Sequence, residues 1–438
     1  MAEILPFRGV LYDPARAGPV DRLIAPPYDV ISPSERSALA SKDPHNFVRL
    51  ILPEGEGDEK YPRAANLLAE WQREGVLRRD ERPALYRYHQ RFSALGKELT
   101  RKGFICRIRL SRYDEGVVLP HERTLSGPKL DRLKLKRATR THLSQVLAVY
   151  PDRRGAVDGA FAETDAAEPD LEARMDGVVH RLFRLTDVPA QARIAAAMAD
   201  KRVYIADGHH RYETMLALRD ELRPLARSSR SSVEYGSMFL TRMEDPGLVI
   251  LPTHRVVHGL TGFDPARFVD RVREQFEVEE LRAVPPDELR DRLATKGRER
   301  PAFLVGLKAR RLLLALRPGA EVAVPGPLPL RTVDVAVLHA LVFEEILGID
   351  RAAQERQANL RYVKDFDGAL GEATLPGVQA AFLLNPTKVE QLQAVADAGE
   401  VMPQKSTYFF PKLASGLVLN PIIPGEDADL LGPEPGSR

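Results

Sequence analysis

The sequence has a single cysteine, Cys106, among its 438 residues. An internal disulfide is therefore excluded, and such a composition suits a reducing compartment. Cys106 stands in an apolar, strand-like run, so we expect it to pack in a core and not to act as a nucleophile. No apolar run approaches the roughly 18 residues of a membrane helix, and residues 1–6 lack the basic-then-apolar pattern of a secretory signal. We expect a cytoplasmic protein without a membrane partner.

The chain also lacks a clear excess of either charge. Its 64 lysines and arginines nearly balance 62 aspartates and glutamates, which gives a formal net charge of +2. A protein that mainly coats nucleic acid would be strongly basic, so the charge balance disfavours a nucleic-acid partner. The basic segment 129–140 is a local exception. A chain of this length is expected to form two or three domains.

Strand-like and helix-like segments alternate, which predicts a mixed α/β (α+β) fold. The residue pattern predicts a strand over 46–51, a helix over 61–74 and a helix over 333–347. Strands over 84–92 and 102–110 are expected to pair as a hairpin, and so are strands over 302–307 and 311–316.

Changes in pattern along the chain predict three regions. We expect an N-terminal catalytic α+β region over residues 1–245 and a C-terminal α+β region over 246–425 that returns the Lys-Ser-Thr block, 405–407, to the catalytic cleft. Residues 426–438 are acidic and rich in proline and glycine, which favours a flexible tail.

The most informative segment joins a strand-like run, 202–205, to a helix-like run, 212–222. Between them stand a carboxylate, a glycine, two imidazoles and a guanidinium: Asp207, Gly208, His209, His210 and Arg211. Glycine permits a sharp turn, and the first N–H groups of the following helix favour an anion. Arg211 adds a forked cation suited to phosphate. The segment predicts a phosphate site; the alternative is a plain connection in which Asp207 caps the helix.

A second loop contains His121, Glu122 and Arg123. A glutamate there can deprotonate a hydroxyl if burial raises its pKa. The alternative is an exposed salt bridge between Glu122 and Arg123.

Two further segments combine polar side chains with a constrained backbone. Lys405, Ser406, Thr407 and Lys412 are typical of a phosphate-facing cluster, although the Gly-x-x-x-x-Gly-Lys-[Ser/Thr] pattern of a P-loop is absent. The alternative is an ordinary strand with solvated lysines. Near the N-terminus, two prolines hold the chain extended before Tyr28 and Asp29. This segment predicts either a wall of a substrate pocket or a rigid turn with a buried tyrosine.

Four blocks of the chain, 25–30, 121–124, 206–212 and 402–412, resemble the bacterial and archaeal family catalogued as domain of unknown function 1015. Residues 207–211 also resemble the ParB/sulfiredoxin-like superfamily, and most closely its free-serine kinases. Those enzymes use a nucleotide, ADP in the archaeal ones, to phosphorylate L-serine with a glutamate as general base. The resemblance implies a ParB/sulfiredoxin-like core with an additional α+β domain.

These observations predict a nucleotide-dependent phosphotransferase that acts on a small hydroxylated metabolite, with L-serine as the best single candidate. The resemblance implies ATP or ADP as the nucleotide and Glu122 as the base. Asp207 is expected to hold Mg²⁺ together with the nucleotide phosphates. The remaining roles divide into catalytic groups (His209, His210), nucleotide or phosphate contacts (Gly208, Arg211, Lys405, Ser406, Thr407, Lys412) and substrate contacts (Tyr28, Asp29, His121, Arg123).

Three alternatives remain open. The same cluster suits a phosphatase that acts on phosphoserine or a similar ester. It also suits a regulatory switch that binds a nucleotide, as ParB does, without product formation. A zinc site built from the histidines is disfavoured, because the helical His-Glu-x-x-His motif is absent. The sequence gives no indication of the oligomeric state.

Overall fold

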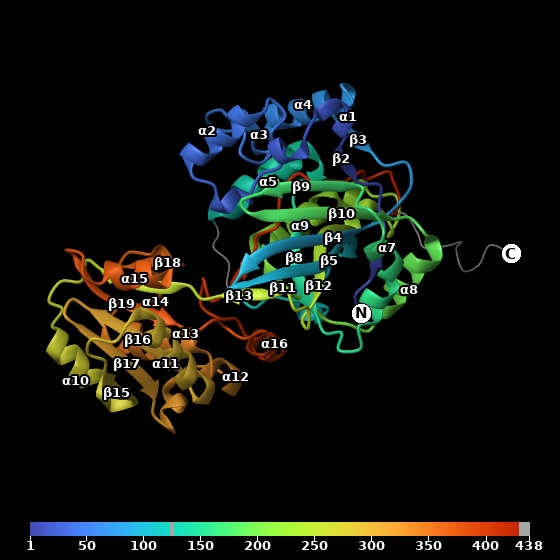
Figure 1. The fold of residues 1–438 in the computed structure, drawn as a ribbon. Helices are drawn as coiled ribbons and strands as arrows, with labels where there is room; N and C mark the ends of the chain where they lie inside the picture. The colour runs from blue at the N-terminus through green and yellow to red at the C-terminus, as the bar shows by residue number, and fades with distance from the viewer. Residues whose placement is uncertain (123–126, 429–438) are drawn as a thin grey trace. The chain divides into compact units, whose positions relative to one another are not determined.

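The structure of the chain is a computed structural model that describes residues 1–122 and 127–428. Arg123 and residues 429–438, which form most of the expected tail, lie outside the described residues. Helices and strands are mixed throughout the chain (Figure 1), so the predicted mixed α/β (α+β) fold is confirmed. Within the described ranges, no helix has the length and apolar character needed to cross a membrane.

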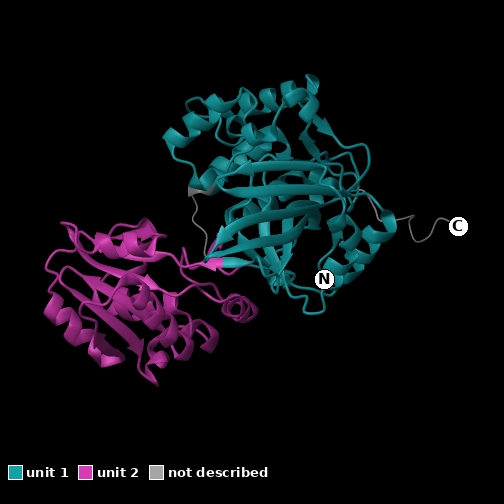
Figure 2. Cartoon of the chain, viewed as in Figure 1, with its two compact units in different colours: residues 1–119, 124–249, 411–438 teal, residues 120–123, 250–410 magenta. Residues whose placement is uncertain are grey.

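The chain forms two compact units (Figure 2). Unit 1 comprises residues 1–119, 124–249 and 411–438, and unit 2 comprises residues 120–123 and 250–410. The last segment of the chain therefore belongs to unit 1, together with the first 119 residues.

A nine-stranded sheet forms the centre of unit 1, with the order β6-β11-β8-β12-β5-β4-β10-β9 and β1 paired with β5. Its strands are β1 (Ile4–Leu5), β4 (Leu85–Ala94), β5 (Lys97–Arg109), β6 (Val118–Leu119), β8 (Val146–Tyr150), β9 (Leu171–Met175), β10 (Val178–Leu185), β11 (Val203–Asp207) and β12 (Tyr235–Arg242). β4 and β5 pair antiparallel, as the sequence predicts. β11 runs antiparallel to β8 and parallel to the short β6.

Helices cover this sheet, and the N-terminal ones gather on one side of the unit, shown in blue in Figure 1. The α-helices of unit 1 are α1 (Pro14–Ala17), α2 (Pro33–Lys42), α3 (Val48–Ile51), α4 (Lys60–Arg73), α5 (Gly127–Thr139), α6 (Ala156–Ala160), α7 (Ala162–Ala166), α8 (Val188–Met198) and α9 (His209–Leu222). The helix α5 contacts both α4 and α9. It thereby connects the N-terminal helices to α9, the helix that begins inside the Asp-Gly-His-His-Arg motif.

The smaller elements of unit 1 are mostly single turns and two-stranded ribbons. They are η1 (Val20–Arg22), η2 (Tyr28–Val30), η3 (Tyr113–Glu115), η4 (Arg223–Leu225) and η5 (Ser232–Glu234), with β2 (Val10–Tyr12) paired to β3 (Leu77–Arg79) and β7 (Thr141–His142) paired to β21 (Asn420–Pro421). The β7–β21 pair fixes the returning C-terminal segment within unit 1.

The strand predicted over 46–51 is wrong, because residues 48–51 form the helix α3. Asn46 starts this turn: its side-chain oxygen accepts the N–H of Val48 at 3.0 Å, and its amide donates to the carbonyl of Arg22 at 2.6 Å. Phe47, Val48, Leu50 and Ile51 are all buried in one apolar cluster with Trp71. Only Arg49 in this segment is half-buried, and a short apolar run with so little exposed surface shows no period that separates helix from strand.

The core beneath the sheet of unit 1 contains Cys106, which is fully buried. Burial raises the pKa of its thiol far above the usual value. Because the thiolate is the reactive form, this cysteine is a packing residue, as the sequence predicts.

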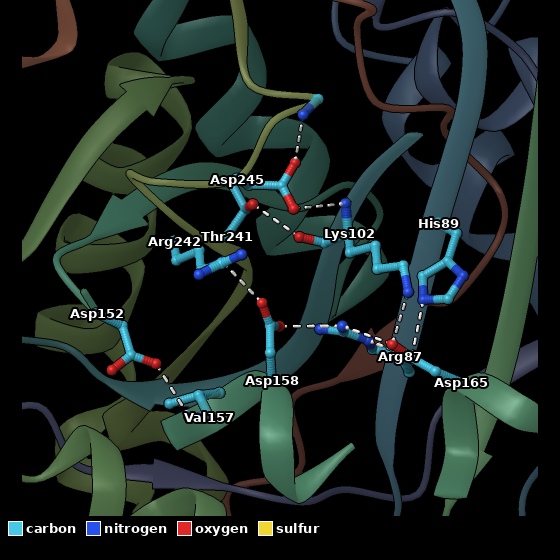
Figure 3. A network of polar contacts seen from close by, with 11 residues as sticks. Arg87, His89, Lys102, Asp152, Val157, Asp158, Asp165, Thr241, Arg242 and Asp245 are labelled. Atoms are coloured by element: carbon cyan, nitrogen blue, oxygen red, sulfur yellow. Dashed lines mark hydrogen bonds and ion pairs between the residues drawn. The ribbon is translucent and has the colours of Figure 1, made fainter. Parts of the chain in front are cut away.

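An ion-pair network attaches α6 and α7 to the sheet of unit 1 (Figure 3). The buried Arg87 on β4 pairs with Asp158 at 3.0 Å and with Asp165 at 2.8 Å. Asp165 also lies 3.0 Å from Nε2 of His89 and accepts a hydrogen bond from Nζ of Lys102 at 3.0 Å. Burial opposes the ionisation of Asp165, but the bonds from His89 and Arg87 outweigh it and hold its pKa well below the usual range.

Asp245 completes the network at the turn that follows β12 (Figure 3). Its carboxylate accepts the N–H of Gly247 at 2.8 Å and the N–H of Lys102 at 3.3 Å. Burial raises the pKa of Asp245 to about 6, and these two backbone bonds only partly oppose the rise. This carboxyl group therefore titrates close to the neutral range.

Unit 2 is built on a six-stranded antiparallel sheet with the order β15-β17-β16-β19-β14-β18. Its strands are β14 (His254–His258), β15 (Phe276–Glu280), β16 (Ala302–Leu307), β17 (Arg310–Leu316), β18 (Leu360–Val363) and β19 (Val378–Leu384). The predicted hairpin over 302–307 and 311–316 is confirmed as β16 and β17. Two short strands, β13 (Val249–Leu251) and β20 (Tyr408–Phe410), lie outside this sheet. β13 begins at Val249, which is the last residue of the segment 124–249 of unit 1.

The helices of unit 2 are α10 (Pro265–Gln275), α11 (Pro286–Glu299), η6 (Ala320–Ala323), α12 (Leu328–Arg331), α13 (Asp334–Val337), α14 (Arg351–Arg356), α15 (Phe366–Glu372) and α16 (Val389–Asp397), with the π-helix η7 (Leu338–Ile346). The helix predicted over 333–347 is thus one α-helical turn followed by nine residues of π-helix. The apolar residues of 333–347 are helical, as the sequence predicts, but their spacing does not distinguish an α-helix from a π-helix.

Candidate anion-binding site

The segment around Gly208 forms a strand, a tight turn and a helix, as the sequence predicts. β11 ends at Asp207, and Gly208 is the N-cap residue of α9 with a φ of 94°. A Cβ atom at Gly208 would lie 2.7 Å from Nε of Arg211. Two features of this position favour glycine. The backbone is left-handed, and the guanidinium of Arg211 packs where a Cβ atom would lie.

Asp207 joins two cations across the start of α9. Its Oδ2 accepts a hydrogen bond from Nη2 of Arg211 at 2.5 Å, and its Oδ1 accepts one from Nζ of Lys412 at 2.6 Å. Burial opposes the ionisation of Asp207, but Lys412 and Arg211 outweigh it and hold the pKa of this carboxyl below its usual range. The charge of the nearby His209 acts in the same direction. Asp207 is therefore ionised at neutral pH and does not occupy the N-cap position.

Arg211 is buried, with 5% of its surface exposed. Its Nη1 donates to the carbonyl of Gln145 at 2.5 Å, so the guanidinium connects α9 to the residue before β8. It thus has a structural contact in addition to its place at the start of the helix.

The neighbouring helix α5 adds a buried lysine. Nζ of Lys136 donates to the carbonyl of Arg211 at 2.9 Å and to Oγ1 of Thr214 at 2.9 Å. Burial, followed by the charges of Arg211 and Arg132, holds the pKa of Lys136 well below its usual value. An anion at this place would be stabilised by the same charges that disfavour protonation of Lys136.

Tyr28 and Asp29 lie next to this group on η2. The guanidinium of Arg132 lies 4.3 Å from the ring centroid of Tyr28, a cation–π contact. Burial raises the pKa of Tyr28, with the charge of Arg211 opposing it, and the charge of Asp29 in turn acts on Arg211. A cavity of about 20 Å³ lies between Tyr28, Lys136 and Arg211, which is room for one water molecule.

The sequence-predicted residues of unit 1 thus form one group: Tyr28, Asp29, Asp207, Gly208, His209, His210, Arg211 and Lys412. His209 is buried and His210 is half-buried. Sequence reasoning missed Arg132 and Lys136. Their signal was the basic segment 129–140, in which these two basic side chains are four residues apart and share one helix face.

The other predicted residues belong to unit 2, where two distant segments meet. The N–H of Met402 donates to the carbonyl of His121 at 2.8 Å. Nε2 of His121 lies 2.9 Å from Oγ1 of Thr407, 286 residues further along the chain. The charge of Glu122 acts on Arg255 and on Tyr362, which places its carboxylate near both.

Hydrogen bonds hold the segment 403–407 in place. Oγ of Ser406 donates to the carbonyl of Pro403 at 2.5 Å, and Nη2 of the buried Arg255 donates to the carbonyl of Lys405 at 2.9 Å. Lys405 is exposed and has a φ of 57°, an uncommon backbone conformation for lysine. Strained residues that their surroundings hold in place occur often at functional sites.

No group of three or more His, Cys, Asp or Glu side chains suited to a metal ion occurs within residues 1–122 and 127–428. Both oxygens of Asp207 already accept hydrogen bonds from cations. A divalent ion at Asp207 would have to share these oxygens with Lys412 and Arg211, so the residues present do not form a resident metal site.

Several solved structures resemble parts of this chain. A free serine kinase variant in complex with ADP has 12% identity and a TM-score of 0.36, and the similarity covers 72% of this chain and 92% of that one. SbnI from Staphylococcus aureus, truncated at its C-terminus, has 12% identity and a TM-score of 0.36 over 74% of this chain and 90% of its own. A conserved hypothetical protein from Pyrococcus furiosus has 13% identity and a TM-score of 0.33 over 75% and 95%. At this level, the similarities assign no activity to the chain.

No curated protein matches the sequence. A family model does match, over residues 4–336, and its description is "Protein of unknown function (DUF1015)". Since this match covers well over half of the chain, the protein belongs to the DUF1015 family.

Proposed function

We propose that unit 1 binds the phosphate groups of a nucleotide at the N-terminus of α9, and that the protein is a nucleotide-dependent phosphotransferase. The proposed acceptor is a small hydroxylated metabolite, with L-serine as the best single candidate. One observation carries the proposal: Lys412 and Arg211 converge on the single carboxylate of Asp207 at a glycine-capped helix start.

The charge balance around this helix start supports an anion as the ligand. Arg211 and Lys412 are cationic groups with little exposure, and both pair with the carboxylate of Asp207. Lys136 donates to the carbonyl of Arg211, and an anion nearby would offset the charges that lower its pKa. The N–H groups of the first helical turn add partial positive charge. Phosphoryl transfer depends mainly on positioning and on electrostatic stabilisation of the transferred group, and such a cluster can supply both.

The proposal gives each group a role. Lys412 and the α9 N-terminus contact the phosphates, with Asp207 and Gly208 setting the position of Lys412 and Arg211. His209 and His210 stabilise the transferred group, and Tyr28 and Asp29 border the acceptor. Mg²⁺ arrives as the counter-ion of ATP or ADP, because a phosphate-bound ion needs few protein ligands.

The roles of unit 2 remain part of the proposal. Glu122 is the proposed base for the acceptor hydroxyl, and His121 is the proposed neighbour of the substrate. Lys405, Ser406 and Thr407 are proposed phosphate contacts, and Arg255 fixes the backbone of Lys405. One similar structure is named a free serine kinase. The phosphate site of this proposal rests on the geometry of residues 207–211, and L-serine is the acceptor that the sequence motif suggests.

Phosphorus NMR tests the proposal directly. The protein is incubated with Mg²⁺, L-serine and either ATP or ADP, and a second sample contains phosphoserine alone. A new phosphomonoester signal in the first sample supports a kinase, and release of inorganic phosphate in the second supports a phosphatase. Nucleotide binding without any product supports the regulatory switch.

Two variants make this experiment specific for the helix start. Lys412→Met removes the cation while keeping an unbranched side chain that is one atom shorter, and it should abolish product formation. Arg137→Gln is the matched control, because Arg137 pairs with Glu221 at 2.7 Å on the exposed faces of the same α5 and α9 helices. A Lys412→Met protein with full turnover would exclude this site as the phosphate site.

A further inference from the structure

Two polar side chains of the central sheet of unit 1 lie beside the segment that carries Lys412. Gln90 on β4 and Arg101 on β5 are direct partners in the antiparallel pair, and both are fully buried, with 0% exposure. Directly opposite residues of neighbouring strands share one face of a sheet. They therefore form a single polar pair inside the unit.

This pair binds two consecutive carbonyl groups. Arg101 donates to Oε1 of Gln90 from Nε at 3.2 Å and also from Nη2, and its Nη2 donates to the carbonyl of Pro411 at 2.6 Å. A guanidinium has donors alone, so the amide oxygen of Gln90 must face it, and the amide nitrogen faces away. That nitrogen, Nε2, donates to the carbonyl of Lys412 at 3.0 Å. The backbone on both sides of the Pro411–Lys412 peptide bond is thus held from the sheet.

The anchored backbone determines where the charge of Lys412 can lie. From it, Nζ of Lys412 reaches Oδ1 of Asp207 at 2.6 Å. An ammonium on a flexible four-carbon stem carries no directional fork of its own, so its position depends on the backbone and on its partner. Gln90 and Arg101 supply the first of these constraints, and Asp207 supplies the second.

Arg101 also acts on the site through its charge. Burial lowers its pKa to about 10, and the charges of Tyr88, Asp245 and Asp207 oppose this effect. The guanidinium therefore remains protonated at neutral pH. A buried charge costs free energy, but its fork binds Gln90 and Pro411 together, which an apolar side chain of the same size cannot do. Arg101 thereby interacts with both ends of the Lys412–Asp207 pair.

We infer that Gln90 and Arg101 are positioning residues of the phosphate site, which hold the backbone of Lys412 so that its ammonium stays at Asp207 and contacts the phosphate groups of a nucleotide. This role rests on the proposed function for the identity of the ligand. Neither side chain needs to touch the nucleotide, because both act through Lys412. All the residues involved belong to unit 1.

Arg107 provides a matched control on the same strand. It lies at an even spacing from Arg101 on β5, which places it on the same face, and it is also fully buried. Its Nε donates to Oδ1 of Asn420 at 3.1 Å and its Nη2 to the carbonyl of Pro421 at 3.1 Å. Arg107 therefore binds the same returning segment, but at a place beyond Lys412.

NMR of protein labelled with ¹⁵N at lysine tests the positioning without a nucleotide. Lysine ammonium groups give sharp signals when hydrogen bonds slow the exchange of their protons, and Lys412→Met identifies the signal of Lys412. Gln90→Met keeps an unbranched side chain of the same length but has no amide donor. The Lys412 signal should shift or disappear in Gln90→Met and in Arg101→Met, and it should stay unchanged in Arg107→Met. Gln90→Met keeps the test decisive if Arg101→Met does not fold.

Titration calorimetry with Mg²⁺ and ATP or ADP tests the consequence for binding. Gln90→Met should weaken nucleotide binding roughly ten-fold, since part of a charge-assisted contact is lost. It should have no further effect in the Lys412→Met protein, because two changes that act through one group are not additive. Arg107→Met should leave the affinity unchanged, which separates positioning from a general loss of stability.

Two outcomes would overturn the inference: an unchanged Lys412 signal in Gln90→Met, or the same loss of affinity from Gln90→Met with and without the Lys412 side chain. Failure of the proposed function gives a different result. If the wild type binds neither ATP nor ADP, the phosphate site is wrong, while the lysine signal still decides whether Gln90 and Arg101 hold Lys412 at Asp207.

Discussion

The ammonium group of Lys412 lies 2.6 Å from Oδ1 of Asp207, although 205 residues separate them. This contact places a cation from the C-terminal segment at the start of α9. It also makes Asp207 the common partner of Lys412 and Arg211. We interpret Asp207 as the group that positions both cations, which is a more direct use of its two oxygens than metal binding.

Replacement of Lys412 by methionine should weaken nucleotide binding. The lost interaction is a charge-assisted hydrogen bond, so we expect about 1.5–3 kcal/mol in binding free energy. Titration calorimetry with ATP and with ADP measures this difference, and Arg137→Gln serves as the charge control. Equal affinities for Lys412→Met and wild type would contradict a phosphate contact at Lys412.

Replacement of Gly208 by alanine should lower the free energy of unfolding. The left-handed conformation alone costs about 1–2 kcal/mol for an L-residue, and the added methyl group would meet Nε of Arg211 at 2.7 Å. Gly177→Ala separates the two effects: Gly177 has a φ of 76°, and a Cβ there meets no described atom within 4 Å. Urea unfolding should show a larger loss for Gly208→Ala than for Gly177→Ala.

Equal losses in these two variants would mean that Arg211 moves away without cost. In that event the packing of Arg211 over Gly208 would not hold the guanidinium in place.

Local patterns in the sequence predict much of the fold around the site. The β4–β5 hairpin and the β11–Gly208–α9 connection follow from apolar periodicity and from one glycine, and the structure confirms both. The segment 46–51 fails because every residue except the half-buried Arg49 is buried, so its apolar residues have no exposed face to set a period. Only tertiary packing decides such a segment.

The partners within the site follow less well from the sequence. The pairing of Lys412 with Asp207 and the pairing of His121 with Thr407 join residues more than two hundred positions apart. Nothing in a local pattern encodes such a contact. The sequence predicts Arg211 as a fork open to phosphate, and its contacts with Gln145 and Asp207 add a structural role that only the fold reveals.

The stability of unit 1 should depend on the protonation of Asp245. Burial raises its pKa from 3.8 to about 6, with Asp158 adding to the rise and Arg101 opposing it. A carboxyl group with a raised pKa in the folded state stabilises the fold when protonated, so its contribution is present below about pH 4 and is lost as the pH rises to about 6. The full change is about 3 kcal/mol.

Asp245→Asn keeps a neutral group of the same size and should remove this dependence. Urea unfolding of both proteins at several pH values between about 4 and 7 measures it. The wild type should lose stability relative to Asp245→Asn as the pH rises across this range. A constant difference would mean that Asp245 has an ordinary pKa in the folded protein.

The role of Glu122 is tested by its replacement with glutamine. A serine hydroxyl is barely ionised near neutral pH, so its phosphorylation needs a base close to the oxygen. Glutamine preserves the size of the side chain and its capacity to accept a hydrogen bond, but it cannot take a proton at neutral pH. If Glu122 is the base, kcat should fall by roughly 10²–10⁴ while nucleotide affinity stays nearly unchanged. Glu390→Gln, at an exposed glutamate of α16, is the control for a lost negative charge in unit 2.

Full turnover by Glu122→Gln would remove Glu122 from the mechanism. A loss of nucleotide binding instead would place Glu122 at the nucleotide or its Mg²⁺, and the base would then have to be Asp29 or His209, which lie beside Arg211 and Asp207 in unit 1.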